Sequence, residues 1–166
     1  QRFGAYGLLG WGAAYATFRE VGPILIGLMF SGRVGSNNAA ELGTMTVSEE
    51  IDALRTMGFG PMRFLVLPRA LALMIVAPLL TLIADLVGMV GGLFVGIASL
   101  DLTFTGYFNE TQKALTMWDV FSGLIKSVVF ALVIALIACQ QGLATSGGAE
   151  GVGRRTTSAV VATLFA

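Results

Sequence analysis

The sequence contains no histidine, one cysteine and few charged residues. Charged residues make up 12% of the 166 residues, roughly half the usual fraction in soluble domains. The missing histidine excludes Ser-His-Asp triads, Cys-His dyads and histidine-based metal sites. Because Cys139 is the single cysteine, the chain cannot form an internal disulfide. Cys139 lies in an apolar run, so we interpret it as a structural thiol. The formal net charge of zero gives no basic field that would attract nucleic acid.

The hydrophobic residues, 55% of the chain, are gathered into long runs. The clearest run, residues 70–100, exceeds the ~20 apolar residues that cross a bilayer. A second run covers about 120–143, and two more begin near Val21 and near Thr157, the last of them truncated. The sequence therefore predicts an all-α integral membrane protein, a polytopic helical bundle forming one transmembrane domain over residues 1–166.

The distribution of charge between the runs predicts their orientation. The segment 101–119 carries three acidic residues and only Lys113 as a cation. The positive-inside rule places arginine-rich segments in the cytoplasm, so we expect 101–119 to be a periplasmic loop. The cytoplasmic side is then marked by the arginines of the two other segments, Arg55, Arg63, Arg69, Arg154 and Arg155.

The chain has no phosphate-cradling glycine loop of the Walker type. Residues 146–153 are rich in glycine, but no Lys-Ser/Thr pair follows them. We interpret this stretch as a flexible cytoplasmic loop. If ATP is used, another chain must bind it.

A short amphipathic helix is predicted over residues 46–58. Thr46 and Glu49 have the spacing of a capping box, and Gly60-Pro61 prevents the helix from continuing. Such a helix lies on the membrane surface or docks on a cytoplasmic partner, and its acidic residues disfavour anionic lipid. We therefore favour docking, through the residues on and beside the apolar face, Val47, Glu49, Glu50, Ile51, Asp52, Leu54 and Met57.

Four charges lie at the edge of the spans or within them. Arg19 and Glu20 precede the helix start at Pro23, where they either form a surface pair or present a guanidinium to a lipid phosphate. Asp85 and Lys126 are single charges within spans, which makes each a functional-site hypothesis. The two either pair with each other or act in function.

Six segments occur in a familiar order, FREVGP at 18–23, SGRVGSNNAAELGTM at 31–45, SEEIDALRTMGFGP at 48–61, PR at 68–69, IKSVVFA at 125–131 and GAEGVGRRTTSAVV at 148–161. Together they resemble the MlaE permease family, the membrane subunit of Mla and other MCE-type lipid ABC transporters. The match covers nearly the whole chain.

The resemblance implies a permease of about five spans, of which the first is missing here. It implies a homodimer in the bacterial inner membrane, moving phospholipid between inner and outer membranes and so maintaining outer-membrane lipid asymmetry. The implied partners are a second copy of the permease, a cytoplasmic ATPase that binds ATP and Mg²⁺, a STAS-domain subunit and a periplasmic MCE-domain ring.

The resemblance also implies roles for particular residues. The helix within 46–58 corresponds to the coupling helix that docks in the ATPase. Arg19 and Glu20 match the family's Arg-Glu pair at the outer entrance of the lipid cavity. Phe3 matches a position beside the cavity that is often tyrosine, and its missing hydroxyl puts a polar headgroup contact there in doubt.

The sequence therefore favours a permease subunit that is not itself an enzyme. One rival is an ion-coupled secondary transporter that uses Asp85 and Lys126. A second is an intramembrane enzyme built on an acidic pair such as Asp85 with Glu41. A third is a structural scaffold, which leaves the acidic cytoplasmic helix unexplained.

Overall fold

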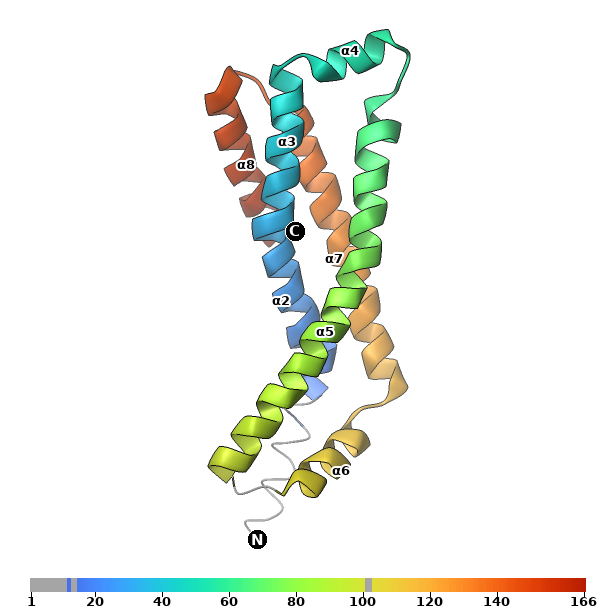
Figure 1. The fold of residues 1–166 in the computed structure, drawn as a ribbon, viewed down its shortest axis with the longest axis vertical. Coiled ribbons are helices and arrows are strands. Elements are labelled where there is room, and N and C mark those ends of the chain that lie inside the picture. Colours follow the sequence, from blue (N-terminus) through green and yellow to red (C-terminus); the bar gives the residue numbers. More distant parts are fainter. Residues whose placement is uncertain (1–11, 13–14, 101–102) are drawn as a thin grey trace. The chain divides into compact units, whose positions relative to one another are not determined.

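The computed structural model describes residue 12 and residues 15–100 and 103–166, and within them it contains helices and turns but no strand. A continuous helix consists of the π-helical segments η1 (Thr17–Val21) and η2 (Phe30–Gly35) and the α-helices α2 (Gly22–Met29) and α3 (Ser36–Val47). The remaining elements are α4 (Glu50–Thr56), η3 (Met62–Val66), α5 (Leu67–Leu100), α6 (Phe104–Ala114), α7 (Met117–Leu143) and α8 (Gly148–Phe165) (Figure 1).

Two helices in the described part of the chain are long and apolar enough to cross a membrane. They are Met62–Val95 and Met117–Leu143, which match the two clearest predicted spans. The predicted spans from Val21 and Thr157 are also helical but are not among these two. The all-α membrane architecture is thus confirmed.

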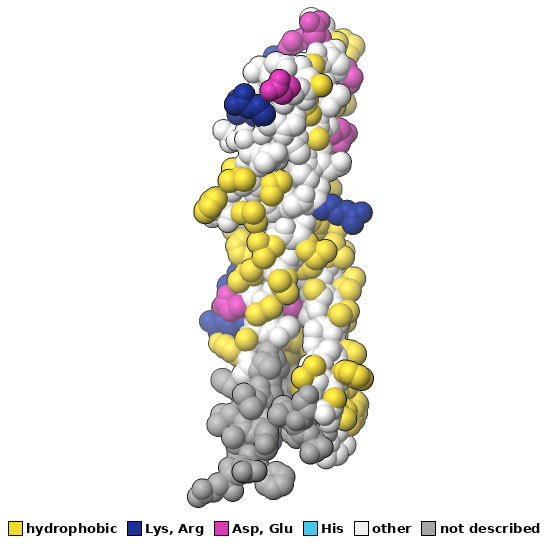
Figure 2. Space-filling view, turned by 90° about the vertical axis from the view of Figure 1, so that its left-hand side faces the viewer, with side chains coloured by type: hydrophobic (Ala, Val, Ile, Leu, Met, Phe, Trp, Pro, Cys, Tyr) yellow, Lys and Arg dark blue, Asp and Glu magenta, His cyan; other side chains and the backbone are white. Residues whose placement is uncertain are grey.

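Large apolar side chains remain exposed along the candidate spans. Val87 and Val90 of α5 are 65% and 66% exposed, and Phe94 is 75% exposed. On the face drawn in Figure 2, apolar side chains lie over much of the helical surface, and acidic side chains gather around α4. Exposed apolar area of this extent needs an apolar environment, and for helices of this length a bilayer provides it.

The chain forms two compact units. Unit 1 contains residues 1–26 and 78–127, and unit 2 contains residues 27–77 and 128–166. In α5 the boundary falls at Pro78, which has no N–H to donate to the helix ladder.

Close backbone approaches hold unit 1 together. A Cβ at Gly123 would overlap the carbonyl oxygen of Phe18, so α7 lies directly against η1. The Tyr107 hydroxyl of α6 donates to the Met89 carbonyl of α5 at 3.3 Å. Segment η1 is thereby fixed against α7, and α6 is tied to α5.

Unit 2 has an apolar core between α3, η3 and α7. A Cβ at Gly142 would crowd Leu42, so α7 and α3 are in close contact. The Ser31 hydroxyl donates to the Val160 carbonyl at 3.3 Å and joins η2 to α8. The core contains the buried residues Leu42, Val66 and Cys139, with Met45, Leu65 and Leu143 packed against them.

The helix predicted over residues 46–58 is divided in the structure. Thr46 lies in α3, whereas Glu49 has a left-handed backbone with φ of 63°. A left-handed residue cannot continue a right-handed helix, so α4 begins only at Glu50. The Thr46 hydroxyl donates to the Leu42 carbonyl at 2.8 Å, and the predicted capping box is wrong.

Two segments predicted as loops contain helices. Residues 148–153 form the start of α8, so the interpretation of 146–153 as a flexible loop is wrong beyond its first residues. Segment 101–119 contains α6 and the start of α7. The side of the membrane on which 101–119 lies stays a prediction.

Candidate functional site

The Arg19-Glu20 pair lies in η1, and glycines let the neighbouring helices approach this segment. Gly88 of α5 is next to the methyl group of Thr17, and Gly123 of α7 faces Phe18. Phe18 is buried, whereas Arg19 and Glu20 remain partly exposed. Wider π-helical turns often occur at functional sites, and here the wider turn carries both charges.

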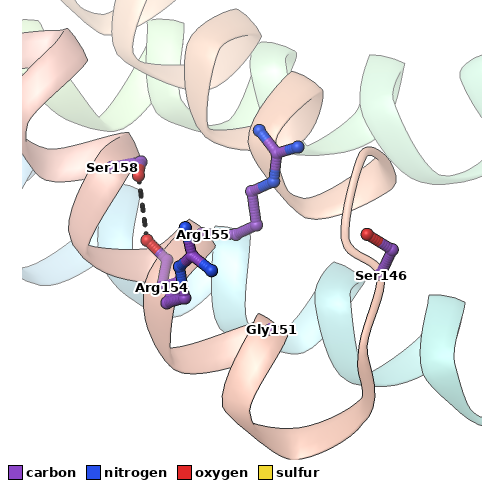
Figure 3. Close-up of a pocket in the computed structure, with 5 residues that line it drawn as sticks. All are labelled: Ser146, Gly151, Arg154, Arg155 and Ser158. Atoms are coloured by element: carbon purple, nitrogen blue, oxygen red, sulfur yellow. Dashed lines mark hydrogen bonds between the residues drawn. The ribbon is translucent and has the colours of Figure 1, made fainter.

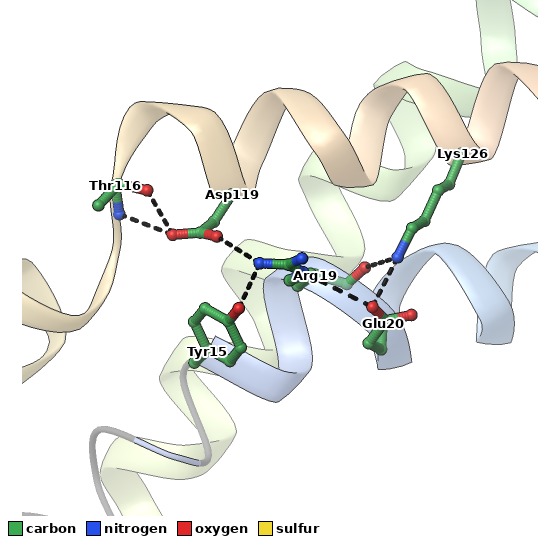
Figure 4. A network of polar contacts seen from close by, with 6 residues as sticks. All are labelled: Tyr15, Arg19, Glu20, Thr116, Asp119 and Lys126. Carbon is green, nitrogen blue, oxygen red and sulfur yellow. Dashed lines mark hydrogen bonds and ion pairs between the residues drawn. The ribbon is translucent and has the colours of Figure 1, made fainter.

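Arg19 is held by contacts from two elements (Figure 4). Its Nη1 lies 3.3 Å from Oδ1 of Asp119 and also donates to the Tyr15 hydroxyl. Its guanidinium carbon lies 5.3 Å from the centre of the Tyr15 ring. Asp119 in turn accepts from the backbone N–H of Thr116 at 3.1 Å and from the Thr116 hydroxyl. Arg19 is therefore fixed by a carboxylate that is itself fixed.

Glu20 joins the second cation to the same network. Oε1 of Glu20 lies 2.6 Å from Nζ of Lys126 and 3.7 Å from Nε of Arg19. Lys126 also donates to the Arg19 carbonyl at 3.2 Å. Two cations and two carboxylates thus alternate along one polar cluster, which we call the charge network, Arg19, Glu20, Asp119 and Lys126.

Asp85 is not part of the charge network. Its side chain is 2% exposed, and its Oδ1 has no hydrogen-bond partner among the described residues. A Cβ at Gly22 would overlap Oδ1 of Asp85, so the carboxyl group is in close contact with the backbone at the start of α2. Lys126 pairs with Glu20, so the described structure shows no ion pair between Asp85 and Lys126, which was one of the two alternatives that the sequence left open.

The sequence analysis identified Arg19, Glu20 and Lys126 as candidate site residues. It missed the other three residues of this region, Tyr15, Thr116 and Asp119. Tyr15 had a usable signal, because residues four apart share a helix face and Tyr15 precedes Arg19 by four. Asp119 and Thr116 lie about a hundred residues further along the chain, and no local pattern links them to Arg19. Phe3, the other predicted cavity residue, lies outside the described residues.

The predicted docking residues are only partly available on the surface. Ile51 is 3% exposed, so it holds α4 against its own chain, and its predicted role on a partner surface is wrong. Leu54 is half-buried and Met57 is 62% exposed. The other predicted members are exposed, namely Val47, Glu49, Glu50 and Asp52.

The acidic pair required by an intramembrane enzyme finds no support. Glu41 instead forms an ion pair, in which its Oε1 lies 2.9 Å from Nη2 of Arg69. Among the described residues there is no group of three or more His, Cys, Asp or Glu that could hold a metal ion.

Comparison with known proteins identifies the family. The family model described as Permease MlaE matches residues 1–166. The chain belongs to the MlaE permease family. The resemblance of the six ordered segments is therefore confirmed over the whole chain.

The relatives of this MlaE-family chain include bacterial and chloroplast proteins. It is 46% identical to a probable ABC transporter permease protein of Rickettsia prowazekii, covering 97% of this chain and 62% of the relative. A probable ABC transporter permease protein of Synechocystis is 43% identical, covering 99% and 62%. The chloroplastic Protein TRIGALACTOSYLDIACYLGLYCEROL 1 of Arabidopsis thaliana is 41% identical, covering 98% and 47%. This chain thus spans about three fifths of the length of the bacterial relatives.

Proposed function

We propose that the chain is the permease part of an ATP-driven phospholipid transporter. The observation that carries the proposal is the charge network, placed next to apolar helices in a member of a permease family. The name of the Arabidopsis relative, which is that of a glycolipid, supports a lipid cargo.

The charge network matches the chemistry of a phospholipid headgroup. A guanidinium presents paired donors to phosphate oxygens, and an ammonium adds a point charge. Arg19 is 38% exposed and Lys126 is 35% exposed, so both cations remain accessible. Glu20, at 51% exposed, is placed to meet a cationic headgroup amine. Exposed apolar side chains of the spans provide a surface for acyl chains.

The energy for transport enters through partners in this proposal. A cytoplasmic ATPase binds ATP and Mg²⁺ and docks on α4 and on Met57, the residue that follows α4. The acidic residues of α4 and the Met57 side chain are exposed. A second permease copy completes the cavity, together with a STAS-domain subunit and a periplasmic MCE-domain ring. Phospholipid then moves between the inner and outer membranes of a bacterium, which maintains outer-membrane lipid asymmetry.

The headgroup role is tested by Arg19→Gln and Lys126→Gln in the full-length permease purified with its ATPase. We expect phospholipid bound per complex to fall by about tenfold, because a charge-assisted hydrogen bond is lost. Recovery of the ATPase should be unchanged. Arg63→Gln is the control, since Arg63 is an exposed arginine of unit 2. Wild-type lipid content in both variants would mean that the network is only structural.

The docking role of α4 is tested by Met57→Asp. A charge in an apolar contact should separate the ATPase from the permease while membrane insertion continues. Phe104→Asp is the control, because Phe104 is a large apolar residue that is 60% exposed but lies in α6, outside both candidate spans. Equal recovery of the ATPase by the wild type and Met57→Asp would remove α4 from the coupling role.

One observation favours a second function, ion-coupled secondary transport. Asp85 is a buried carboxyl group with an unpartnered oxygen in a candidate span, which suits a transient ion or proton site. In that case Asp85 and Lys126 couple cargo to a gradient, transport continues without ATP, and an ionophore stops it. ATP-dependent transport that is insensitive to ionophores would exclude this alternative.

A further inference from the structure

A second polar site lies in unit 2, where the linker after α7 meets the first turns of α8. It is a pocket of about 360 Å³ lined by Ser146, Gly151, Arg154, Arg155 and Ser158 (Figure 3). Among the described residues, two arginines and two serine hydroxyls line it, together with Gly151 and without an acidic side chain. Its charge is therefore unbalanced, in contrast to the charge network of unit 1.

The backbone of the linker brings Ser146 next to the arginines. Gly147 and Gly148 have positive φ values of 88° and 70°, which side-chain-bearing residues rarely adopt. The chain then turns back so tightly that a Cβ at Gly151 would overlap the Ser146 carbonyl oxygen. Ser146 consequently faces the same pocket as Arg154, although it lies before the helix begins.

The two arginines are held differently. Nη1 of Arg155 donates to Oε1 of Gln141 at 3.0 Å, which fixes that side chain against α7. The guanidinium of Arg154 is exposed and has no hydrogen-bond or ion-pair partner among the residues described. The Ser158 hydroxyl donates to the Arg154 carbonyl at 2.9 Å. One guanidinium is thus positioned in advance, and the other is free to bind a ligand.

The position of the pocket relative to the end of the candidate span indicates which ligand it would meet. Gln141 lies two residues before the end of the candidate span Met117–Leu143, so Arg155 is held at the level where that span ends. Lipid headgroups occupy this level of a membrane, and anionic lipids attract arginine there. A phosphate group offers oxygens that match paired guanidinium donors.

We propose that this pocket binds the phosphate group of an anionic phospholipid at the membrane surface where α7 ends. Arg154 and Arg155 hold the phosphate oxygens, and the Ser146 hydroxyl donates a further hydrogen bond. This site does not depend on the cargo role of the charge network, and the bound lipid is a resident of the permease. Inorganic phosphate shares the chemistry and is the other source to be tested.

The test uses the full-length permease in detergent, with bound molecules counted by native mass spectrometry. The probes are dioctanoyl phosphatidylglycerol, dioctanoylglycerol without a phosphate, and inorganic phosphate. The key variant is Arg154→Gln, because its exposed side chain can be changed without disturbing the fold. Arg63→Gln is the matched control, an exposed arginine of the same unit. Arg155→Lys tests the fork geometry while the charge is retained.

We expect phosphatidylglycerol to bind with an affinity about tenfold lower in Arg154→Gln, and nearly unchanged in Arg63→Gln. Arg155→Lys should weaken binding less than Arg154→Gln does, and dioctanoylglycerol should not occupy the site. Equal weakening by Arg63→Gln would overturn the proposal in favour of general charge attraction. Arg154-dependent binding of inorganic phosphate, as tight as that of the lipid, would overturn the lipid source.

Discussion

Two carboxyl groups of unit 1, those of Asp119 and Asp85, are both nearly excluded from solvent but have different surroundings. Asp119 receives two hydrogen bonds from Thr116 and lies 3.3 Å from Arg19. Asp85 has a buried oxygen without a partner in the described structure and lies against Gly22. Burial of a carboxyl group is thus compensated in the first case and uncompensated in the second.

The difference indicates two kinds of role. Asp119 orients a cation, so its charge matters to whatever Arg19 binds. Asp85 lies at a helix contact where its volume matters, because only glycine fits opposite it. Substitutions that separate charge from volume therefore distinguish the two carboxyl groups.

The largest effect is expected from Gly22→Ala. Its new methyl group would overlap Oδ1 of Asp85, and overpacking of this kind costs about 2 kcal/mol. Asp85→Ala in the same chain should restore most of the lost thermal stability, measured on the full-length permease in detergent. The control is Gly123→Ala, which meets the backbone oxygen of Phe18 and which Asp85→Ala should not restore. Failure of the rescue would show that Asp85 does not define this contact.

The next effect concerns Asp119→Asn. This change keeps the shape of the side chain and its contact with Thr116, but it removes the negative charge beside Arg19. We expect phospholipid bound per complex to fall by about threefold. This corresponds to the free energy that a partly exposed ion pair contributes. The fold should be retained, as judged by thermal unfolding. Lipid content equal to that of the wild type would show that Asp119 does not position Arg19.

Sequence patterns predicted the parts of this protein that depend on neighbouring residues. The runs that became α5 and α7 were clear because a membrane span requires continuous apolar residues. The helix in the loop after α3 was predicted from its apolar spacing, but its start was placed too early. A capping-box spacing cannot reveal that Glu49 adopts a left-handed backbone.

Pairings between distant residues were beyond the reach of the sequence. Asp85 and Lys126 are the only charged residues within the two clearest predicted spans, so the sequence left open whether they pair with each other or act in function. The observed partner of Lys126 is Glu20, which the pattern placed at the membrane edge. Which carboxylate meets a cation depends on how η1 packs against α7, and the contact at Gly123 decides this.

A smaller effect is expected from Asp85→Asn. The change keeps the volume and removes the charge of a carboxyl group whose Oδ1 has no partner among the described residues, so thermal stability should stay the same or rise slightly. ATP-dependent lipid transport should stay within about twofold of the wild type, as for a residue without an electrostatic partner. Loss of gradient-driven transport with normal folding would instead favour the ion-coupled alternative.

The smallest effect is the energetic coupling between Asp85 and Lys126. A double-mutant cycle with Asp85→Asn and Lys126→Gln should give an interaction free energy within about 0.5 kcal/mol of zero, because the described structure shows no ion pair or hydrogen bond between these two residues. The matched cycle with Glu20→Gln and Lys126→Gln should give a favourable coupling of about 0.5 kcal/mol, since this pair is joined at 2.6 Å but half-exposed. Both cycles are measured by thermal unfolding of the full-length permease under one set of conditions. A larger coupling for Asp85 than for Glu20 would favour the Asp85–Lys126 pair that the sequence left open and would make Asp85 a member of the charge network.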